Sequence, residues 1–183
     1  MMSTRNLALS GLFVAIMLIL GYLEKILSLG LGYGIKLGLS NCVLLLCLYW
    51  FGIPVSVVLM LSKVFLSSLL FGGFNPISLS LSLAGGSISM LGMALMVFAA
   101  REVSPVGAGV VGGVLHNVGQ VLVAVLVYSY PLLYSYIALL VAVGAVMGGI
   151  TGTIVVRLKH FLPYERRKQF GFLSKKDEDR AGG

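Results

Sequence analysis

Six long runs of apolar residues make up most of this sequence and restrict the folds that it can adopt. Apolar runs of about 17 to 25 residues can cross a bilayer as helices, and in lipid only helices or closed barrels satisfy every backbone polar group. Barrel strands would alternate polar and apolar residues, which these runs do not. We therefore predict an all-α integral membrane protein with six transmembrane helices, at residues 7–23, 37–53, 55–71, 77–99, 106–128 and 132–156.

Composition and the positions of the prolines support this reading. The chain of 183 residues is 58% hydrophobic and only 10% charged, which is too apolar for a soluble domain of this size. Pro54, Pro76, Pro105 and Pro131 stand at the starts of predicted helices, where proline suits the first turn. Only a tight turn at residues 51–54 separates the second run from the third, so a single longer segment with a re-entrant portion is the alternative.

The basic residues predict the orientation in the membrane. With six spans, one side would hold ten of the 13 Lys and Arg residues: Arg5, Arg101, Arg157, Lys159, Arg166, Arg167, Lys168, Lys175, Lys176 and Arg180. Only Lys25 and Lys36 would lie on the opposite side. In membrane proteins, Lys and Arg accumulate in the segments on the cytoplasmic side of the membrane. We therefore expect a multi-pass protein of the cell membrane with both termini cytoplasmic. Residues 1–156 would form the transmembrane domain, and residues 157–183 a flexible basic tail.

The net charge of +7 is mostly a property of that tail. A basic cytoplasmic segment is typical of an orientation signal with some affinity for anionic lipids. The lipid bilayer is therefore the expected partner of this charge, and nucleic acid is not.

Polar residues within the predicted helices lie at the midplane or in the outer half. His116 and Gln120 are four residues apart and Asn117 and Gln120 three apart, so the three are expected to share one helical face. Lys63 lies near the middle of the third run and Asn41 in the outer part of the second. We predict that these residues line an outward-open ligand site.

Lys63 is the strongest indication of a bound ligand. A charged side chain at this depth costs several kcal/mol unless it meets water, an acid or a ligand. Glu24 is expected at the outer boundary and Glu102 on the cytoplasmic side, so neither is at the depth of Lys63. We therefore expect an anionic ligand or a water-filled cavity beside Lys63. The alternative is that the amides and serines only bond helices to one another.

Two further groups of small residues have two possible roles each. Gly85 and Gly86, in the fourth run, permit either close helix packing or a local break near a ligand. Ala8, Gly11 and Ala15 form a ridge on one face of the first run, because steps of three and four residues share a face. Such a ridge could contact a helix of another protein or a neighbouring helix of its own bundle.

Three segments carry a resemblance to a known family: GIKLGLSNCVLLLCLYWFG at residues 34–52, SLAGGSISMLGMAL at 82–95 and GGVLHNVGQ at 112–120. They resemble the signature segments of the Gx transporter family, also labelled heptaprenyl diphosphate synthase component I. The resemblance covers about residues 5–156. This family is similar to the S components of energy-coupling-factor transporters, which are six-helix proteins that bind vitamins and related molecules in an outward-facing pocket.

The resemblance also implies possible partners. In S components a small-residue motif on the first helix contacts the energy-coupling subunit, and Ala8, Gly11 and Ala15 approximate that motif. Members of the family are associated with membrane electron-transfer systems that use flavin and demethylmenaquinone. The resemblance thus implies an energy-coupling module or a membrane redox protein as the partner.

Three classes of function remain open at this point. The first is capture or transport of a small vitamin-, quinone- or isoprenoid-like molecule. The second is a membrane subunit or anchor of a flavin- or quinone-linked electron-transfer system. No cofactor is evident for it, because the chain has no Cys cluster, no paired helix histidines and no flavin attachment motif.

The third class is prenyl-chain synthesis. Enzymes of that type hold magnesium diphosphate through paired Asp-rich motifs. Here adjacent acidic residues occur only in the tail, at Asp177, Glu178 and Asp179. We therefore expect a non-enzymatic protein without a metal site. A phosphate-binding G-x-x-x-x-G-K-[ST] motif is also absent, so active transport would need an energised partner or an ion gradient.

Overall fold

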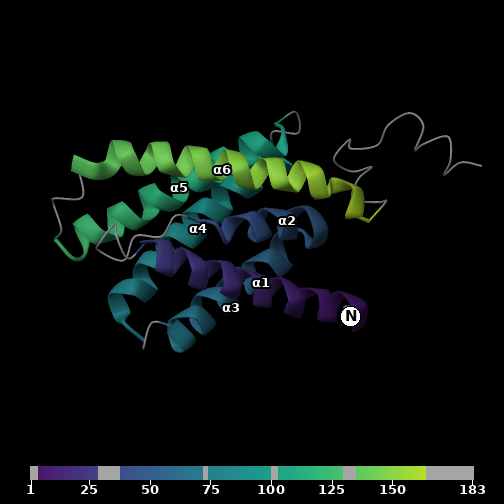
Figure 1. Ribbon diagram of the computed structural model, residues 1–183, viewed down its shortest axis with the longest axis horizontal. Coiled ribbons are helices and arrows are strands. Elements are labelled where there is room, and N and C mark those ends of the chain that lie inside the picture. The colour runs from purple at the N-terminus through teal and green to yellow at the C-terminus, as the bar shows by residue number, and fades with distance from the viewer. Residues whose placement is uncertain (1–3, 29–37, 72–73, 100–102, 130–134, 164–183) are drawn as a thin grey trace, which may run out of the picture.

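The structure, a computed structural model, describes residues 4–28, 38–71, 74–99, 103–129 and 135–163. The regular secondary structure of these residues is entirely helical, which confirms the predicted all-α class. They form α1 (Thr4–Ser28), α2 (Asn41–Phe51), α3 (Ile53–Phe71), α4 (Pro76–Phe98), α5 (Pro105–Leu126), α6 (Ile137–Leu158) and the short 3₁₀ helix η2 (Lys159–Phe161) (Figure 1). Lys36, Arg101, Glu102, Pro131 and the tail from residue 164 lie outside the described residues.

Five of the six α-helices in the described part of the chain are long and apolar enough to cross a membrane, and α2 is not. The sequence predicts a second span at residues 37–53, but the helix has only 11 residues. At about 1.5 Å per residue it covers roughly half of a 30 Å hydrocarbon core. Gly38 and Gly52, with φ of +84° and +83°, flank it. The predicted full-length second span is therefore wrong in its bounds.

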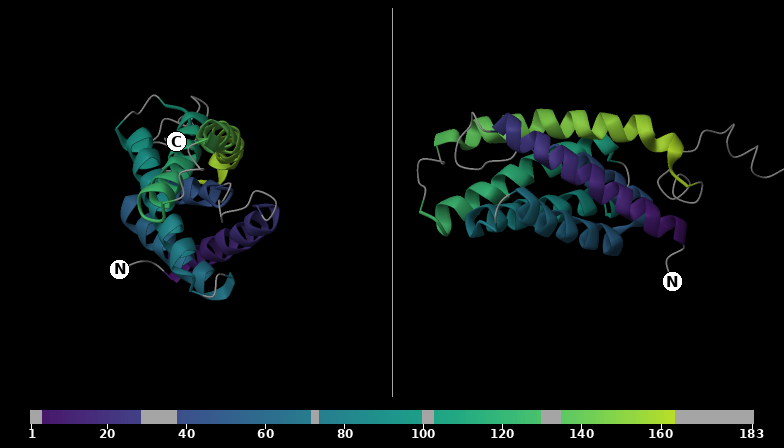
Figure 2. Two further views of the ribbon diagram at one scale, coloured as in Figure 1. Left: turned by 90° about the vertical axis from the view of Figure 1, so that its left-hand side faces the viewer. Right: turned by 60° about the horizontal axis from the view of Figure 1, so that its bottom comes forward.

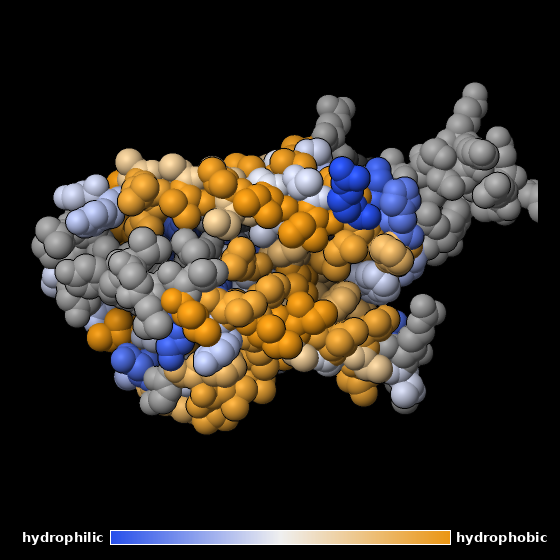
Figure 3. All heavy atoms as spheres, viewed as in Figure 1, coloured by the Kyte–Doolittle hydropathy of each residue, from blue (hydrophilic) through white to orange (hydrophobic). Residues whose placement is uncertain are grey.

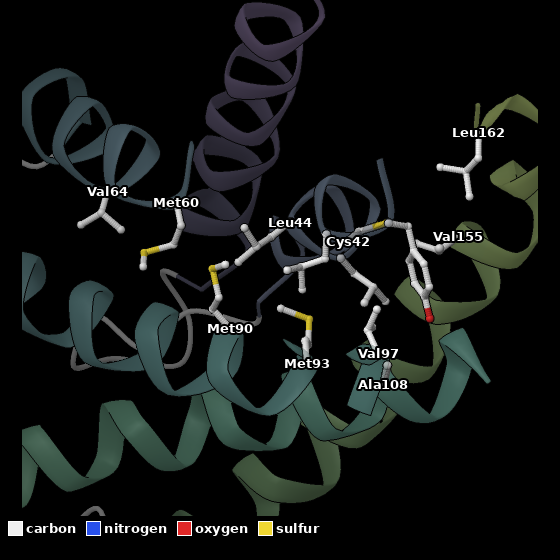
Figure 4. Close-up of a cluster of buried hydrophobic side chains, with 13 residues drawn as sticks. Cys42, Leu44, Met60, Val64, Met90, Met93, Val97, Ala108, Val155 and Leu162 are labelled. Carbon is white, nitrogen blue, oxygen red and sulfur yellow. The ribbon is translucent and has the colours of Figure 1, made fainter. Parts of the chain in front are cut away.

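α2 forms the centre of the bundle. Leu45, Cys47 and Leu48 are fully buried, and Leu44 and Tyr49 nearly so. In Figure 4, Met60 of α3 and Met90 and Met93 of α4 lie in one cluster of buried side chains with the α2 residues Leu44 and Cys42. A helix that is apolar on every side is stable when protein covers it on every side. This burial explains why the α2 segment is as hydrophobic as a spanning helix.

The starts of α4 and α5 follow the signals in the sequence. Asn75 accepts backbone hydrogen bonds from Ile77 and Ser78, and Pro76 occupies the first turn of α4. Ser104 caps α5 in the same way, immediately before Pro105. Such caps satisfy amide groups that otherwise lack a partner at a helix start.

Helices α4, α5 and α6 form the most tightly packed part of the bundle. The backbones of α5 and α6 meet at glycines: a Cβ atom added at Gly144 would lie 2.6 Å from the carbonyl oxygen of Gly113. One added at Gly113 would overlap the Gly144 carbonyl oxygen. Small residues let transmembrane helices approach this closely. Gly113 and Gly144 therefore have a packing role.

α1 lies at the edge of the bundle and crosses it obliquely (Figure 2). Phe13 packs edge-on against Trp50 and Phe51 at the end of α2, with ring centroids 5.9 and 5.7 Å apart. Most of the remaining surface of α1 is exposed and apolar, as at Leu12 and Ile19.

The outer surface suits a lipid environment. The face in Figure 3 shows a broad hydrophobic band along the bundle, with hydrophilic residues concentrated toward its ends. The N-terminal end of α1 and the C-terminal end of α6 lie at the same end of the molecule (Figures 1 and 2). These features show a multi-pass membrane-type helical protein.

Candidate ligand site

The polar residues of α5 that the sequence singles out are buried in the bundle. His116 and Gln120 are 2% and 1% exposed, and the Gln120 side-chain nitrogen lies 2.6 Å from His116 Nε2. Because an amide nitrogen only donates, His116 Nε2 accepts this bond, which leaves the proton of a neutral imidazole on Nδ1. The pair shares one face of α5, as predicted.

Gly85 of α4 lets α4 contact this pair directly. A Cβ atom added at Gly85 would lie 2.9 Å from both Gln120 Cγ and the His116 carbonyl oxygen, and 3.0 Å from His116 Nδ1. Any side chain larger than hydrogen would therefore displace the two polar residues. Of the two predicted roles for Gly85, the structure shows close packing, and it places that packing at the polar pair.

Asn41 and Gly38 approach the same histidine from the segment that begins α2. A Cβ atom added at Gly38 would lie 3.1 Å from Asn41 Nδ2 and 3.5 Å from His116 Cδ2. Asn41 is 4% exposed, and its Nδ2 has no hydrogen-bond partner among the described residues. A buried amide nitrogen without a partner is costly, which makes Asn41 the strongest indication of a missing polar group at this point.

Lys63 has an acidic neighbour, contrary to the expectation from the sequence. Its side chain lies along α1, where a Cβ atom added at Gly21 would be 3.9 Å from Lys63 Cε. Glu24, one turn further along α1, is 1% exposed and attracts Lys63 electrostatically. The Glu24 carboxylate also accepts a hydrogen bond from the Gly38 backbone N–H. The expectation that Lys63 lacks an acid at its depth is therefore wrong.

The spacing of residues in the first helix indicates that Glu24 is buried, but the predicted end of that helix at residue 23 excluded Glu24. α1 continues to Ser28, one turn or more past the predicted end at residue 23. Phe13, Met17, Gly21 and Glu24 follow one another in steps of four, four and three residues, and all are buried. This spacing places Glu24 on the inward face of α1 rather than at the membrane surface. Glu24 and Gly38 are the residues that sequence reasoning missed.

The amide nitrogen of Asn117 contacts α6. It donates to the Leu140 carbonyl oxygen of α6 at 2.6 Å and lies beside Gly144. His116 and Gln120 instead contact α4. A step of one residue turns a helix by about 100° and a step of three leaves about 60°, so Asn117 lies at the α6 side of this face and its role in the ligand site stays a prediction. Asn117 thus bonds α5 to α6.

Gly86 and two of the α4 serines, Ser80 and Ser82, also have packing roles. A Cβ atom added at Gly86 would lie 3.2 Å from the Met60 sulfur of α3. Ser82 donates to the Ser78 carbonyl oxygen, and Ser80 bonds to the Tyr128 hydroxyl at 2.9 Å. Ser89 is different: it is fully buried and its hydroxyl has no hydrogen-bond partner among the described residues.

The ridge of small residues on α1 is exposed. Ala8, Gly11 and Ala15 face away from the bundle, and nothing lies within 4 Å of a Cβ atom added at Gly11. The ridge therefore does not pack against a neighbouring helix among the described residues. Its predicted contact with another protein stays a prediction.

We define the polar cluster as Glu24, Gly38, Asn41, Lys63, Gly85, His116 and Gln120, which come from five helices and the segment before α2. In this cluster Glu24 connects Lys63 to Gly38, and Gly38 adjoins Asn41 and His116. Its hydrogen-bonding groups could hold a polar headgroup, while the surrounding apolar side chains could hold the rest of a ligand. Among the described residues no group of three His, Cys, Asp or Glu side chains is placed to hold a metal ion.

A comparison with protein families identifies the chain. A model of the family described as heptaprenyl diphosphate synthase component I matches residues 13–158, about four fifths of the chain. No curated protein and no solved structure matched the chain. The family match includes all six helices in whole or in part, and every residue of the polar cluster. The chain therefore belongs to the heptaprenyl diphosphate synthase component I family.

Proposed function

We propose that this protein captures a small vitamin-, quinone- or isoprenoid-like molecule in the membrane and binds its polar end at the polar cluster. The observation that carries the proposal is Asn41, whose buried Nδ2 lacks a hydrogen-bond partner among the described residues and lies beside Gly38 and His116. Intramembrane polar groups are costly, and they commonly mark binding sites or substrate pathways. A ligand with a carbonyl or hydroxyl oxygen would satisfy this amide.

Ligand entry requires a change in the bundle. Asn41, His116 and Gln120 are all at least 96% buried, because none is more than 4% exposed. We propose that the ligand enters from the outer face, as the S-component resemblance implies, and that the loosely packed α1 moves to admit it. The support for this motion is that α1 lies at the edge of the bundle and buries little of its surface.

The proposal includes a membrane partner. Transport against a gradient needs energy, and the sequence has no nucleotide-binding P-loop motif. The exposed ridge of Ala8, Gly11 and Ala15 would let a helix of an energy-coupling module approach α1 closely. We place the protein in the cell membrane with both termini cytoplasmic, supported by the positions of its basic residues.

The family name favours a second candidate, in which the chain is one component of a heptaprenyl diphosphate synthase. We propose that the chain does not catalyse chain elongation by itself, because its only run of adjacent acidic residues, Asp177, Glu178 and Asp179, is in the tail. Incubating the purified protein with farnesyl and isopentenyl diphosphates tests this point. Chain elongation without another protein would overturn it. A role in electron transfer has no supporting feature among the described residues.

Native mass spectrometry and an absorbance spectrum of the protein purified from its host membrane test the main proposal. We expect one small apolar molecule with an oxygen-containing polar end, bound at up to one copy per chain. A bound flavin would instead support the electron-transfer alternative. A protein that carries no small molecule, and binds none from a membrane extract, would contradict ligand capture.

A further inference from the structure

The two charges of the polar cluster bear on which ligands it can accept. Among the described residues, Glu24 and Lys63 are the only buried Asp, Glu, Lys or Arg side chains, at 1% and 8% exposure. They carry opposite charges and attract each other across α1 and α3. The cluster therefore has no net charge when both are ionised and His116 is neutral.

We propose that Glu24 determines ligand specificity: by neutralising Lys63 it makes the polar cluster select an uncharged polar headgroup and reject an anion such as a diphosphate. This inference rests on the proposed function, since it names the class of molecule that the same site accepts. It goes against the expectation from the sequence alone, in which an unpaired Lys63 would attract an anion.

Two neighbouring groups of Glu24 support this role. One is Lys63, whose Cε adjoins α1 at Gly21, one turn before Glu24. The other is the backbone N–H of Gly38, which donates to the carboxylate. Gly38 in turn lies against Asn41 and His116. The carboxylate of Glu24 thus lies close to the Asn41 amide that would meet the ligand, because both groups adjoin Gly38.

This position penalises an anion for two reasons. An anionic headgroup beside Asn41 would lie close to the Glu24 carboxylate, because both Asn41 and that carboxylate adjoin Gly38. In a medium of low dielectric constant, repulsion between like charges is much stronger than in water. An anion would also leave the buried cluster with a net negative charge, which is costly in the membrane interior.

An uncharged oxygen meets no such penalty. Asn41 Nδ2 is a donor without a partner among the described residues, and a carbonyl or hydroxyl oxygen can accept from it. The Glu24–Lys63 pair need not separate for this bond to form. The favoured ligand is therefore an apolar molecule that ends in a neutral alcohol, ketone or quinone-like oxygen.

Farnesol and farnesyl diphosphate are suitable probes, because they share one apolar chain and differ in the charge of the headgroup. Binding of each is measured by ligand-induced thermal stabilisation of the full chain in nanodiscs of uncharged phosphatidylcholine. We expect the wild-type protein to bind farnesol roughly tenfold or more tightly than farnesyl diphosphate. Tighter binding of the diphosphate by the wild-type protein would overturn the inference.

Two variants test whether Glu24 is the cause. Glu24→Gln leaves Lys63 uncompensated, so we expect the preference to reverse toward farnesyl diphosphate. The double variant Glu24→Gln, Lys63→Met is again neutral, so it should prefer farnesol and should fold even if the single variant does not. A farnesol preference of the same size in Glu24→Gln, or a diphosphate preference in the double variant, would contradict the role of Glu24.

The outcomes separate this inference from the proposed function. Equal binding of both probes by the wild-type protein would overturn the charge selection and leave ligand capture standing. Failure of the wild-type protein to bind either probe, with no molecule found by native mass spectrometry, would overturn both.

Discussion

Glu24 on α1 and Lys63 on α3 are buried, carry opposite charges and attract each other. Removing one member of such a pair leaves an uncompensated charge, which costs about 3–5 kcal/mol. We therefore predict that Lys63→Met and Glu24→Gln each lower the free energy of unfolding by an amount of that order. Reversible denaturant unfolding in detergent micelles measures the change.

The double variant is the control for this prediction. With both charges removed, we expect the free energy of unfolding to recover most of the loss, so that the two changes are strongly non-additive. Additive losses in the double variant would show that the two side chains do not interact.

The contact between the α5 and α6 backbones gives a second prediction. Gly113→Ala would force a methyl group into the Gly144 carbonyl oxygen, so we expect a loss of about 1–3 kcal/mol or more in the free energy of unfolding. Gly11→Ala is the matched control, because open space surrounds Gly11. The control should be neutral or gain up to about 1 kcal/mol from the higher helix propensity of alanine. Equal stability of the two variants would contradict the close packing.

Substitutions of Asn117 and Gln120 are predicted to affect different properties: stability for Asn117 and ligand binding for Gln120. Asn117→Leu removes the hydrogen bond to the Leu140 carbonyl oxygen, so we expect a loss of about 1–3 kcal/mol in the free energy of unfolding and little change in the affinity of the folded protein for its ligand. Gln120→Leu removes a group of the polar cluster and should mainly weaken binding. Thermal unfolding and ligand titration on the same samples distinguish the two. A binding defect confined to Asn117→Leu would show that the cluster is wrongly delimited.

Cysteine labelling tests the orientation. Phe74 is exposed in the turn before α4, so a cysteine placed there should react with an impermeant thiol reagent added outside intact cells. A cysteine at Lys175 should react only after the cells are opened. The natural Cys42 and Cys47 are buried and should contribute little background. The reverse pattern would show that the termini are outside.

The sequence predicts the helical class, the family and the starts of α4 and α5, because these depend on local composition, proline and capping residues. It does not predict the length of α2. The hydropathy of an apolar segment does not distinguish a helix covered by lipid from one covered by protein. Only the tertiary contacts show that α2 is enclosed by other helices. Chain turns with positive φ at Gly38 and Gly52 end the helix at points that hydropathy does not mark.

Part of the candidate site also cannot be predicted from the sequence. The spacing of His116 and Gln120 within α5 predicts their shared face, because both lie in one regular helix. The contacts of Lys63 depend on how α1 crosses α3, so no spacing within α3 identifies Glu24 as its neighbour. Gly38 meets His116 although 78 residues separate them, and only the fold brings them together.

The most direct test of the ligand site measures how much of the native ligand co-purifies with variants of the polar cluster. Native mass spectrometry would compare the wild-type protein with Asn41→Leu, Gln120→Leu and the control Ser80→Ala, whose hydroxyl bonds to Tyr128 away from the cluster. We predict that each cluster variant folds but loses roughly tenfold or more in affinity, from a lost contact of about 1.4 kcal/mol, while the control retains the ligand. Wild-type ligand occupancy in both folded cluster variants would contradict the assignment of the site.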